Sequence, residues 1–243
     1  MPSFTLPSVI AHRGASAYAP ENTAAAMLEA SKRGADWVEF DCRLSRDLGV
    51  VIMHDRSLKR TTGVRGQVQN WNTSDLTELD AGSWFAKQHS GENIPTLEQI
   101  LPLLEQQNLG ANIEIKTPAK QAEIAIREII SLLETTSTAL QHKILISSSC
   151  QKTLDLMCKY APSYPCGYII HKWPRLLRKK LHNKSYYSIH LNRKILNKNR
   201  VKLLIDMGFK VLAYTVNDKK TAEKLFSWGV ASVFSDKPDL LID

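Results

Sequence analysis

Two apolar segments of the sequence carry carboxylates at a spacing that suits metal binding. Glu39 and Asp41 stand two residues apart in "WVEFDCRLS", so both side chains point to the same face of an extended strand. In "ANIEIK", Glu114 and Lys116 repeat this spacing. Three carboxylates in one pocket repel one another, and a hard divalent cation relieves that repulsion. The sequence therefore predicts one divalent cation, Mg²⁺ or Ca²⁺, held by Glu39, Asp41 and Glu114.

Histidines and cations end other apolar segments. His12 and Arg13 directly follow "VIA", and His54 follows "VVIM". The guanidinium of Arg13 and the ammonium of Lys116 suit neutralisation of a phosphate. Imidazoles transfer protons near neutral pH, which predicts general acid/base roles for His12 and His54. A cation site, a phosphate clamp and two imidazoles together indicate cleavage of a phosphoester, although either histidine could be the base.

Eight expected strands, separated by amphipathic stretches, must position these residues. Alternating strands and helices favour an α/β fold with a parallel sheet, and eight strands predict a (β/α)8 TIM barrel. The active site of such a barrel lies at the carboxyl ends of its strands, where the residues above would meet. The expected strands are 8–12, 37–44, 111–116, 143–148, 166–171, 186–191, 210–216 and 231–235. The expected helices are 22–33, 96–107, 119–134, 150–160, 197–207 and 218–228.

One interval departs from this alternation after the second strand. Residues 49–55 resemble the return strand of a hairpin, and residues 56–95 show no long helical period. A long segment of this kind inside a compact domain is usually functional or folded on itself. We expect residues 1–243 to form a single barrel domain with a small insertion at about 56–95.

Composition and segment hydropathy predict a cytoplasmic protein. The 243 residues are 43% hydrophobic, and no apolar run approaches the length needed to span a membrane. The first residues lack the basic and apolar regions of a signal peptide. The four cysteines form no zinc-binding pattern and are expected to be free thiols.

The net charge of +8 is concentrated in one part of the chain. Residues 156–205 contain 12 of the 32 Lys and Arg residues and no Asp or Glu. The densest part, "HKWPRLLRKKLHNK" (171–184), predicts a short amphipathic turn after the fifth strand. It suits a solvated face, a rim that attracts anionic substrate, or peripheral contact with an anionic membrane. No nucleic-acid-binding motif accompanies it, so no nucleic-acid partner is expected.

Ten segments, in order along nearly the whole chain, make the sequence resemble the glycerophosphodiester phosphodiesterase family. They are "HRG" (12–14), "PENT" (20–23), "VEFDCRLSRD" (38–47), "HD" (54–55), "RTTG" (60–63), "LDAGSWF" (79–85), "IPTLEQIL" (94–101), "NIEIK" (112–116), "YTVND" (214–218) and "SDKPD" (235–239). The resemblance implies a TIM barrel with an inserted segment. It also implies metal-dependent hydrolysis of glycerophosphodiesters, small molecules derived from phospholipids, to sn-glycerol 3-phosphate and an alcohol.

The resemblance assigns roles to individual positions. Glu39, Asp41 and Glu114 match the metal ligands, His12 and His54 match the acid/base pair, and Arg13 and Lys116 match phosphate contacts. Glu21 and Asn22 fall on "PENT", where a site-shaping role is expected. Tyr214 is also expected to shape the site, and it stands where the family often has Trp. Ser235 stands where the family often has Thr, and "SSSC" (147–150) lacks the aromatic residue that is common there. These differences leave the preferred alcohol open.

Two other classes of protein remain as alternatives. One is a phosphodiesterase on a similar barrel that cleaves phospholipids or phosphoinositides. The other is a catalytically silent barrel that acts as a binding module, although silent relatives typically lose a histidine or a metal ligand and this chain has them all. Within the family, a substrate hydroxyl can attack first and form a cyclic phosphate, or water can attack directly. The sequence does not distinguish these routes, and it leaves the oligomeric state open.

Overall fold

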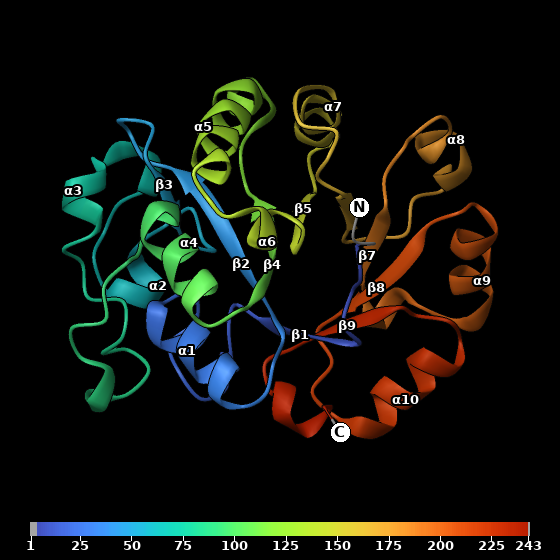
Figure 1. Ribbon diagram of the computed structural model, residues 1–243, viewed down its shortest axis with the longest axis horizontal. Helices are drawn as coiled ribbons and strands as arrows, with labels where there is room; N and C mark the ends of the chain where they lie inside the picture. The colour runs from blue at the N-terminus through green and yellow to red at the C-terminus, as the bar shows by residue number, and fades with distance from the viewer. Residues whose placement is uncertain (1–3, 243) are drawn as a thin grey trace.

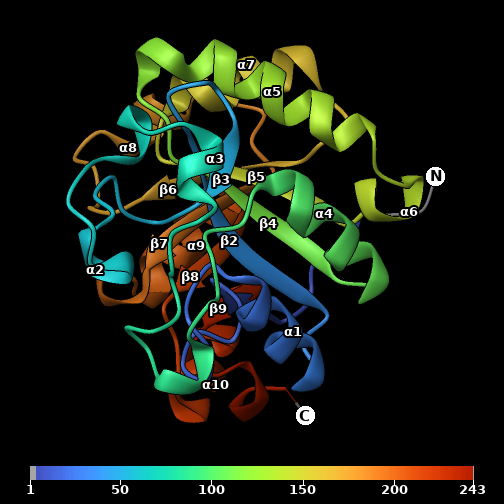
Figure 2. The same cartoon turned by 90° about the vertical axis from the view of Figure 1, so that its left-hand side faces the viewer.

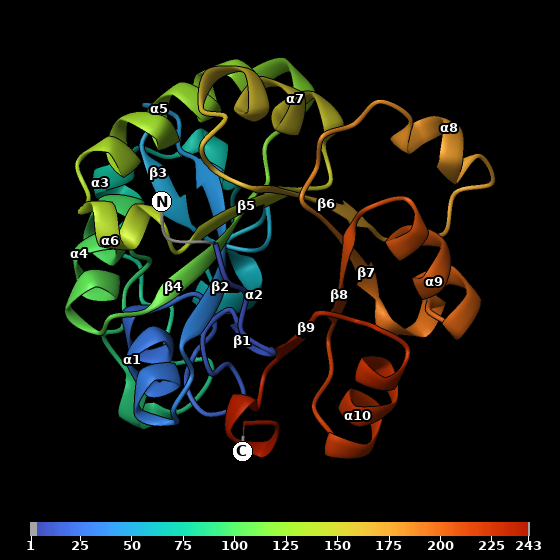
Figure 3. The same cartoon turned by 45° about the vertical axis from the view of Figure 1, so that its right-hand side comes forward.

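Eight parallel strands close into a barrel in the computed structural model, which describes residues 4–242. In Figure 3 the chain colour runs around the ring of strands, so that the first and last strands lie side by side. The barrel strands are β1 (Val9–His12), β2 (Trp37–Leu44), β4 (Gly110–Ile115), β5 (Ile144–Ser148), β6 (Cys166–Ile170), β7 (Ser188–Asn192), β8 (Lys210–Tyr214) and β9 (Ser232–Ser235). Pairing of β1 with both β2 and β9 closes the barrel and confirms the predicted TIM fold.

Helices cover the outside of the barrel between successive strands (Figure 1). The longer ones are α1 (Ala24–Lys32), α4 (Leu97–Gln106), α5 (Ala122–Glu134), α7 (Gln151–Tyr160), α9 (Lys198–Asp206) and α10 (Lys219–Ser227). Several begin at a side chain that accepts a backbone N–H, as Thr23 does for α1 and Asp218 for α10. Thr96 and Gln99 form a reciprocal capping box at the start of α4. Apolar faces of these helices pack on the strands in the main core.

A small apolar cluster fills the part of the barrel interior that lies towards the amino ends of the strands. Ile10, Trp37, Leu145, Leu212 and Phe234 are buried there together. Ile10 stands two residues before His12, and Trp37 stands two residues before Glu39. His12 and Glu39 are register partners in the pairing of β1 with β2. Because alternate residues of a strand share a face, the polar residues of β1 and β2 point into the same interior nearer the carboxyl ends.

The inserted segment lies between β2 and α4, as predicted. Strand β3 (Val50–Ile52) pairs antiparallel with β2. Only short helical turns follow, which lie beside the barrel in Figure 2: α2 (Lys59–Thr62), η1 (Val68–Asn70), α3 (Thr73–Leu76) and η2 (Lys87–His89). The segment has its own buried apolar cluster, which includes Leu58, Val68 and Leu76. It is therefore folded on itself.

The basic segment after β6 contains the short helix α8 (Leu177–Leu181). Leu177 and Leu181 are buried, whereas Leu176 is 65% exposed beside exposed Arg178, Lys179 and Lys180. A short helix that sequence patterns did not predict, α6 (Thr138–Gln141), precedes β5. All four cysteines are free thiols. Among residues 4–242, no helix combines the length and the apolar character needed to cross a membrane.

Candidate active site

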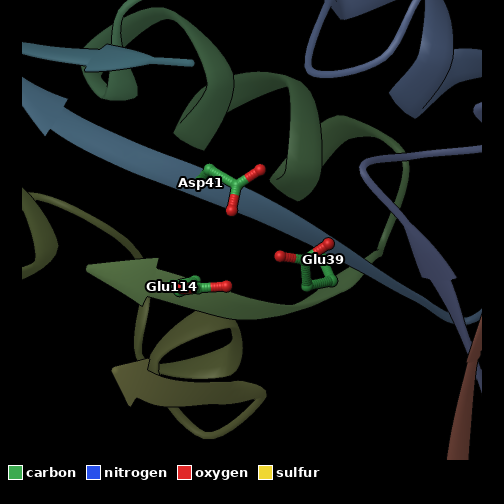
Figure 4. Close-up of side chains that lie close together, drawn as sticks. All are labelled: Glu39, Asp41 and Glu114. Atoms are coloured by element: carbon green, nitrogen blue, oxygen red, sulfur yellow. The ribbon is translucent and has the colours of Figure 1, made fainter. Parts of the chain in front are cut away.

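Three carboxylates meet inside the barrel where β2 pairs with β4. Glu39 and Asp41 project from β2 and Glu114 from β4, and Figure 4 shows them pointing into a common space. Asp41 and Glu114 are partners in the strand register, and one oxygen from each of the three carboxylates lies within 4.8 Å of the others. Glu39 is 4% exposed and Asp41 is 1% exposed. The strand pairing thus brings together the three predicted ligands.

The electrostatics of this cluster favour a cation. Burial, reinforced by the charges of Asp41 and Glu114, raises the pKa of Glu39 well above its usual value. Burial and the charge of Asp41 likewise raise the pKa of Glu114. The cluster consists of oxygen donors, which hard divalent cations prefer over nitrogen or sulfur. These residues therefore fit a divalent cation of the Mg²⁺ or Ca²⁺ type.

Two positively charged side chains, Lys116 and Arg13, flank the carboxylates, as the sequence predicts. Lys116 Nζ lies 2.7 Å from Glu114 Oε1 and 3.3 Å from Asp41 Oδ1. Arg13 Nε lies 3.5 Å from Asp41 Oδ2. Burial opposes ionisation of Asp41, but the charges of Lys116 and Arg13 outweigh it and hold its pKa well below the usual range. Asp41 is therefore ionised, and both cations face the same pocket as the carboxylates.

The loop after β1 holds Arg13 and Asp41 in place. Glu21 Oε1 accepts a 2.7 Å hydrogen bond from Arg13, and Asn22 Nδ2 donates a 2.9 Å hydrogen bond to Asp41. Asn22 Oδ1 also accepts from the backbone N–H of Asp41. Gly14 has a φ of +77°, and a Cβ there would lie 2.6 Å from backbone atoms of Ala26 in α1. The "HRG" and "PENT" segments therefore fix this loop and orient the Arg13 guanidinium and the Asp41 carboxylate.

His12 at the end of β1 is paired with a carboxylate from the other end of the chain. Its Nδ1 lies 2.7 Å from Asp236 Oδ1, and its Nε2 lies 3.9 Å from Glu39 Oε2. Ser16 and Asn217 donate to the same Asp236 carboxyl. Burial opposes ionisation of Asp236, but its contact with His12 helps to lower its pKa to about 2. Asp236 thus orients the imidazole, and it was not among the predicted site residues although it lies in "SDKPD".

His54 follows β3 and has a matching carboxylate partner. Its Nδ1 lies 2.6 Å from Asp55 Oδ1, and Arg60 holds the other oxygen of Asp55 at 2.6 Å. Arg60 also donates to Glu21, which connects the inserted segment to the "PENT" loop. Burial lowers the pKa of His54 below its ordinary value. The neutral imidazole, suited to accept a proton, is therefore favoured at neutral pH.

A single pocket, open to solvent, joins these groups. Both histidines, Arg13, Glu39, Glu114, Lys116 and Tyr214 line it. Tyr214 OH lies 2.9 Å from His171 Nδ1, so the predicted site-shaping residue lies in the pocket wall. Glu21 and Asn22 instead stand behind Arg13 and Asp41, with side chains directed at those residues rather than into this pocket.

The floor of the pocket holds polar residues that sequence patterns did not single out. His190 is buried, bonded to Ser188, and burial lowers its pKa to about 3, so it is neutral. Gly167 makes room for this imidazole, because a Cβ there would collide with the ring. Asn112 donates to Ser147, and its buried Oδ1 has no hydrogen-bond partner among residues 4–242. Asn112 begins the "NIEIK" segment but was not among the predicted site residues, whereas His190 belongs to none of the ten segments.

Comparisons with known proteins agree with this geometry. The pattern of the Glycerophosphoryl diester phosphodiesterase family matches residues 12–240. A glycerophosphodiester phosphodiesterase of Caldanaerobacter subterraneus subsp. tengcongensis is 32% identical over 241 residues, which cover 97% of this chain and 96% of the relative. One from Bacillus subtilis is 30% identical over 248 residues, which cover 95% of this chain and 84% of the relative.

A solved structure shares the whole fold. A phosphodiesterase from Oleispira antarctica, in complex with the product sn-glycerol 3-phosphate, superposes with a TM-score of 0.92 at 34% identity. The match covers 97% of this chain and 95% of that one. The barrel, its acidic pocket and these matches define a phosphoric diester hydrolase. The chain belongs to the glycerophosphoryl diester phosphodiesterase family, and the resemblance of its ten segments is confirmed.

Proposed function

We propose that the chain hydrolyses glycerophosphodiesters to sn-glycerol 3-phosphate and an alcohol, with a divalent cation held by Glu39, Asp41 and Glu114. His12 and His54 would form the general acid/base pair. The observation that carries this proposal is the placement of both histidines, the carboxylates and two cations around one pocket. The product bound to the Oleispira antarctica relative supports the same substrate class.

Arg13 and Lys116 bind the phosphate in this proposal. Both are half-buried and paired with carboxylates, so their positions are fixed before substrate enters. Burial alone would lower the pKa of Lys116, but the charges of Asp41 and Glu114 outweigh it, and its pKa is raised. Both groups are therefore cations at neutral pH and stabilise charge that develops on the phosphoryl oxygens. When bound, the divalent cation would add Lewis-acid stabilisation of the same oxygens.

The two histidines have the arrangement that paired proton transfer requires. Each bonds a carboxylate through Nδ1, which leaves Nε2 to face the pocket. One imidazole removes the proton of the attacking hydroxyl, and the other protonates the leaving alkoxide. The attacking group is a glycerol hydroxyl, which gives a cyclic phosphate, or water. A transient cyclic phosphate signal in ³¹P NMR identifies the first route.

Asp236 is expected to act as a positioning residue for His12. Asp236→Asn keeps the size of the side chain but removes the carboxylate that holds Nδ1, so kcat falls by about 10-fold to 100-fold while KM changes little. Steady-state kinetics measure both parameters. Asp239→Asn is a matched control, because Asp239 contacts Tyr18 and Arg33 rather than the site. A kcat close to wild type in the Asp236 variant would remove this residue from the mechanism.

The basic segment 171–184 is expected to steer anionic substrate towards the pocket. It begins at His171, which lines the pocket, and continues into α8. Neutralising Arg178, Lys179 and Lys180 to Gln should lower kcat/KM by about 3-fold to 10-fold at low salt and leave kcat nearly unchanged. The two proteins should converge at high ionic strength. Equal kcat/KM at every salt concentration would show that this segment is only a solvated face.

A further inference from the structure

Two hollows adjoin the catalytic pocket on the side of β2 and the inserted segment. They share four lining residues: Arg43, Arg56, Lys116 and Thr117. We call the two hollows together the cationic side pocket. Lys116 also lines the catalytic pocket, and Glu114 lines both that pocket and one hollow. The proposed phosphate site at Lys116 is therefore open on two sides. One side leads to Tyr214 and Phe234, and the other leads to the cationic side pocket.

The two guanidinium groups of this side pocket have no ion pair among residues 4–242, whereas Lys116 is paired with Glu114 and Asp41. Arg56 is exposed, and its guanidinium has no ion pair or hydrogen bond to any residue in the range 4–242. The neighbouring Asp55 is already held by Arg60 and His54. Arg43 donates to the backbone carbonyls of His54 and Lys116, which fixes its charge without cancelling it. Glu114 is the single carboxylate among the described lining residues, and Lys116 is bonded to it.

An unsatisfied polar atom lies in the same place. Thr117 is 7% exposed, lines both hollows, and its buried Oγ1 has no hydrogen-bond partner among the described residues. A buried hydroxyl without a partner costs free energy, which a ligand that bonds it recovers. Ser149 lines one hollow and Gln69 lines the other, and both residues are exposed. The side pocket thus offers cations and hydroxyl groups to a ligand.

A phosphodiester has two ester arms, so a phosphate bound at Lys116 can send one arm to each side. We propose that the cationic side pocket receives the leaving alcohol and selects an alcohol that carries an anionic group, with Arg56 as the specificity-determining residue. This inference rests on the proposed hydrolysis of glycerophosphodiesters and names the alcohol that the sequence left open. The anionic group is a carboxylate or a second phosphate, since a guanidinium binds either one.

The same features disfavour a cationic alcohol such as choline. Arg43, Arg56 and Lys116 repel an ammonium group. Quaternary ammonium groups are recognised by aromatic faces, and no aromatic side chain lines either hollow within residues 4–242. The preference therefore comes from attraction of one class of alcohol and repulsion of the other.

The experiment compares kcat/KM for four substrates under the same ionic conditions. Bis(glycerophospho)glycerol presents a second phosphate, and glycerophosphoglycerate presents a carboxylate without an ammonium group. Glycerophosphoglycerol has a neutral alcohol, and glycerophosphocholine has a cationic one. We expect kcat/KM for at least one anionic substrate to exceed that for glycerophosphocholine by about tenfold or more. The anionic substrate with the larger kcat/KM shows whether phosphate or carboxylate is the favoured group.

Variants of Arg56 assign the preference to this pocket. The ratio of interest is kcat/KM for the better anionic substrate divided by kcat/KM for glycerophosphocholine. Arg56→Glu should lower this ratio by about tenfold and raise kcat/KM for glycerophosphocholine, because a carboxylate at position 56 repels an anionic alcohol. Arg56→Lys keeps the charge and should keep most of the preference. Lys210→Glu makes the same change of charge at the exposed amino end of β8, at the opposite end of the barrel, and should leave the ratio unchanged.

Separate outcomes contradict the inference and the proposed function. A wild-type ratio near one, or a ratio that Arg56→Glu leaves unchanged, would overturn the role of Arg56 while hydrolysis itself stands. Failure of the wild-type protein to hydrolyse any of the four substrates with Mg²⁺ or Ca²⁺ present would overturn the proposed function, and the inference with it.

Discussion

In excess chelator, hydrolysis of glycerophosphoethanolamine should fall by at least about 10³-fold and return when Mg²⁺ or Ca²⁺ is restored. The reason lies in the three carboxylates around one space, because burial raises the pKa of Glu39 and of Glu114. Such a cluster is stabilised by a cation that its oxygens can bind. A coupled assay for glycerol 3-phosphate measures the loss and the recovery, and comparing the two ions identifies the preferred one.

A matched pair of variants separates metal loss from general damage. Glu114→Gln removes one ligand charge and should weaken activation by the metal, which appears as a higher metal concentration at half-maximal rate. Glu98→Gln, at an exposed position in the first turn of α4, should leave that concentration unchanged. Full turnover in excess chelator would contradict the metal site.

His12→Ala and His54→Ala should each lower kcat by at least about 10²-fold while the protein stays folded. Both imidazoles line one pocket and each is held by a carboxylate, so each variant removes an oriented proton-transfer group. Both side chains are only partly buried, which limits the cavity that alanine leaves. Steady-state kinetics and circular dichroism measure activity and fold for each variant.

The control for these variants is His142→Ala, because His142 is exposed at the end of α6, away from the pocket. It should retain wild-type kcat. If either His12→Ala or His54→Ala keeps near wild-type turnover, that histidine has no part in proton transfer.

The barrel could be predicted from the sequence because its strands are short apolar runs between amphipathic stretches. Local patterns of this kind also place residues by face, and the two-residue spacing of Glu39 and Asp41 correctly predicted a shared side of β2. The position of Glu114 beside Asp41 depended on the rule that parallel strands meet at their carboxyl ends. The predicted metal ligands therefore required only local pattern and fold class.

Contacts between distant loops were beyond such patterns. Asp236 reaches His12 across 224 positions, and Arg60 reaches Glu21 from the inserted segment. No spacing rule connects those residues. The pairing of β1 with β9 brings Asp236 to His12, and the path of the inserted segment brings Arg60 to Glu21. The cationic side pocket also arises from tertiary structure, since Arg56 and Lys116 are 60 positions apart in the sequence.

The measurement that tests the central claim most directly is ³¹P NMR of the purified protein with sn-glycero-3-phosphoserine and a divalent cation. Our account predicts that the diester signal disappears while sn-glycerol 3-phosphate appears in equal amount together with free serine. Formation of phosphoserine and glycerol would show cleavage of the other ester bond and would contradict the proposed reaction. A diester signal that persists with every cation supplied would contradict the proposed activity.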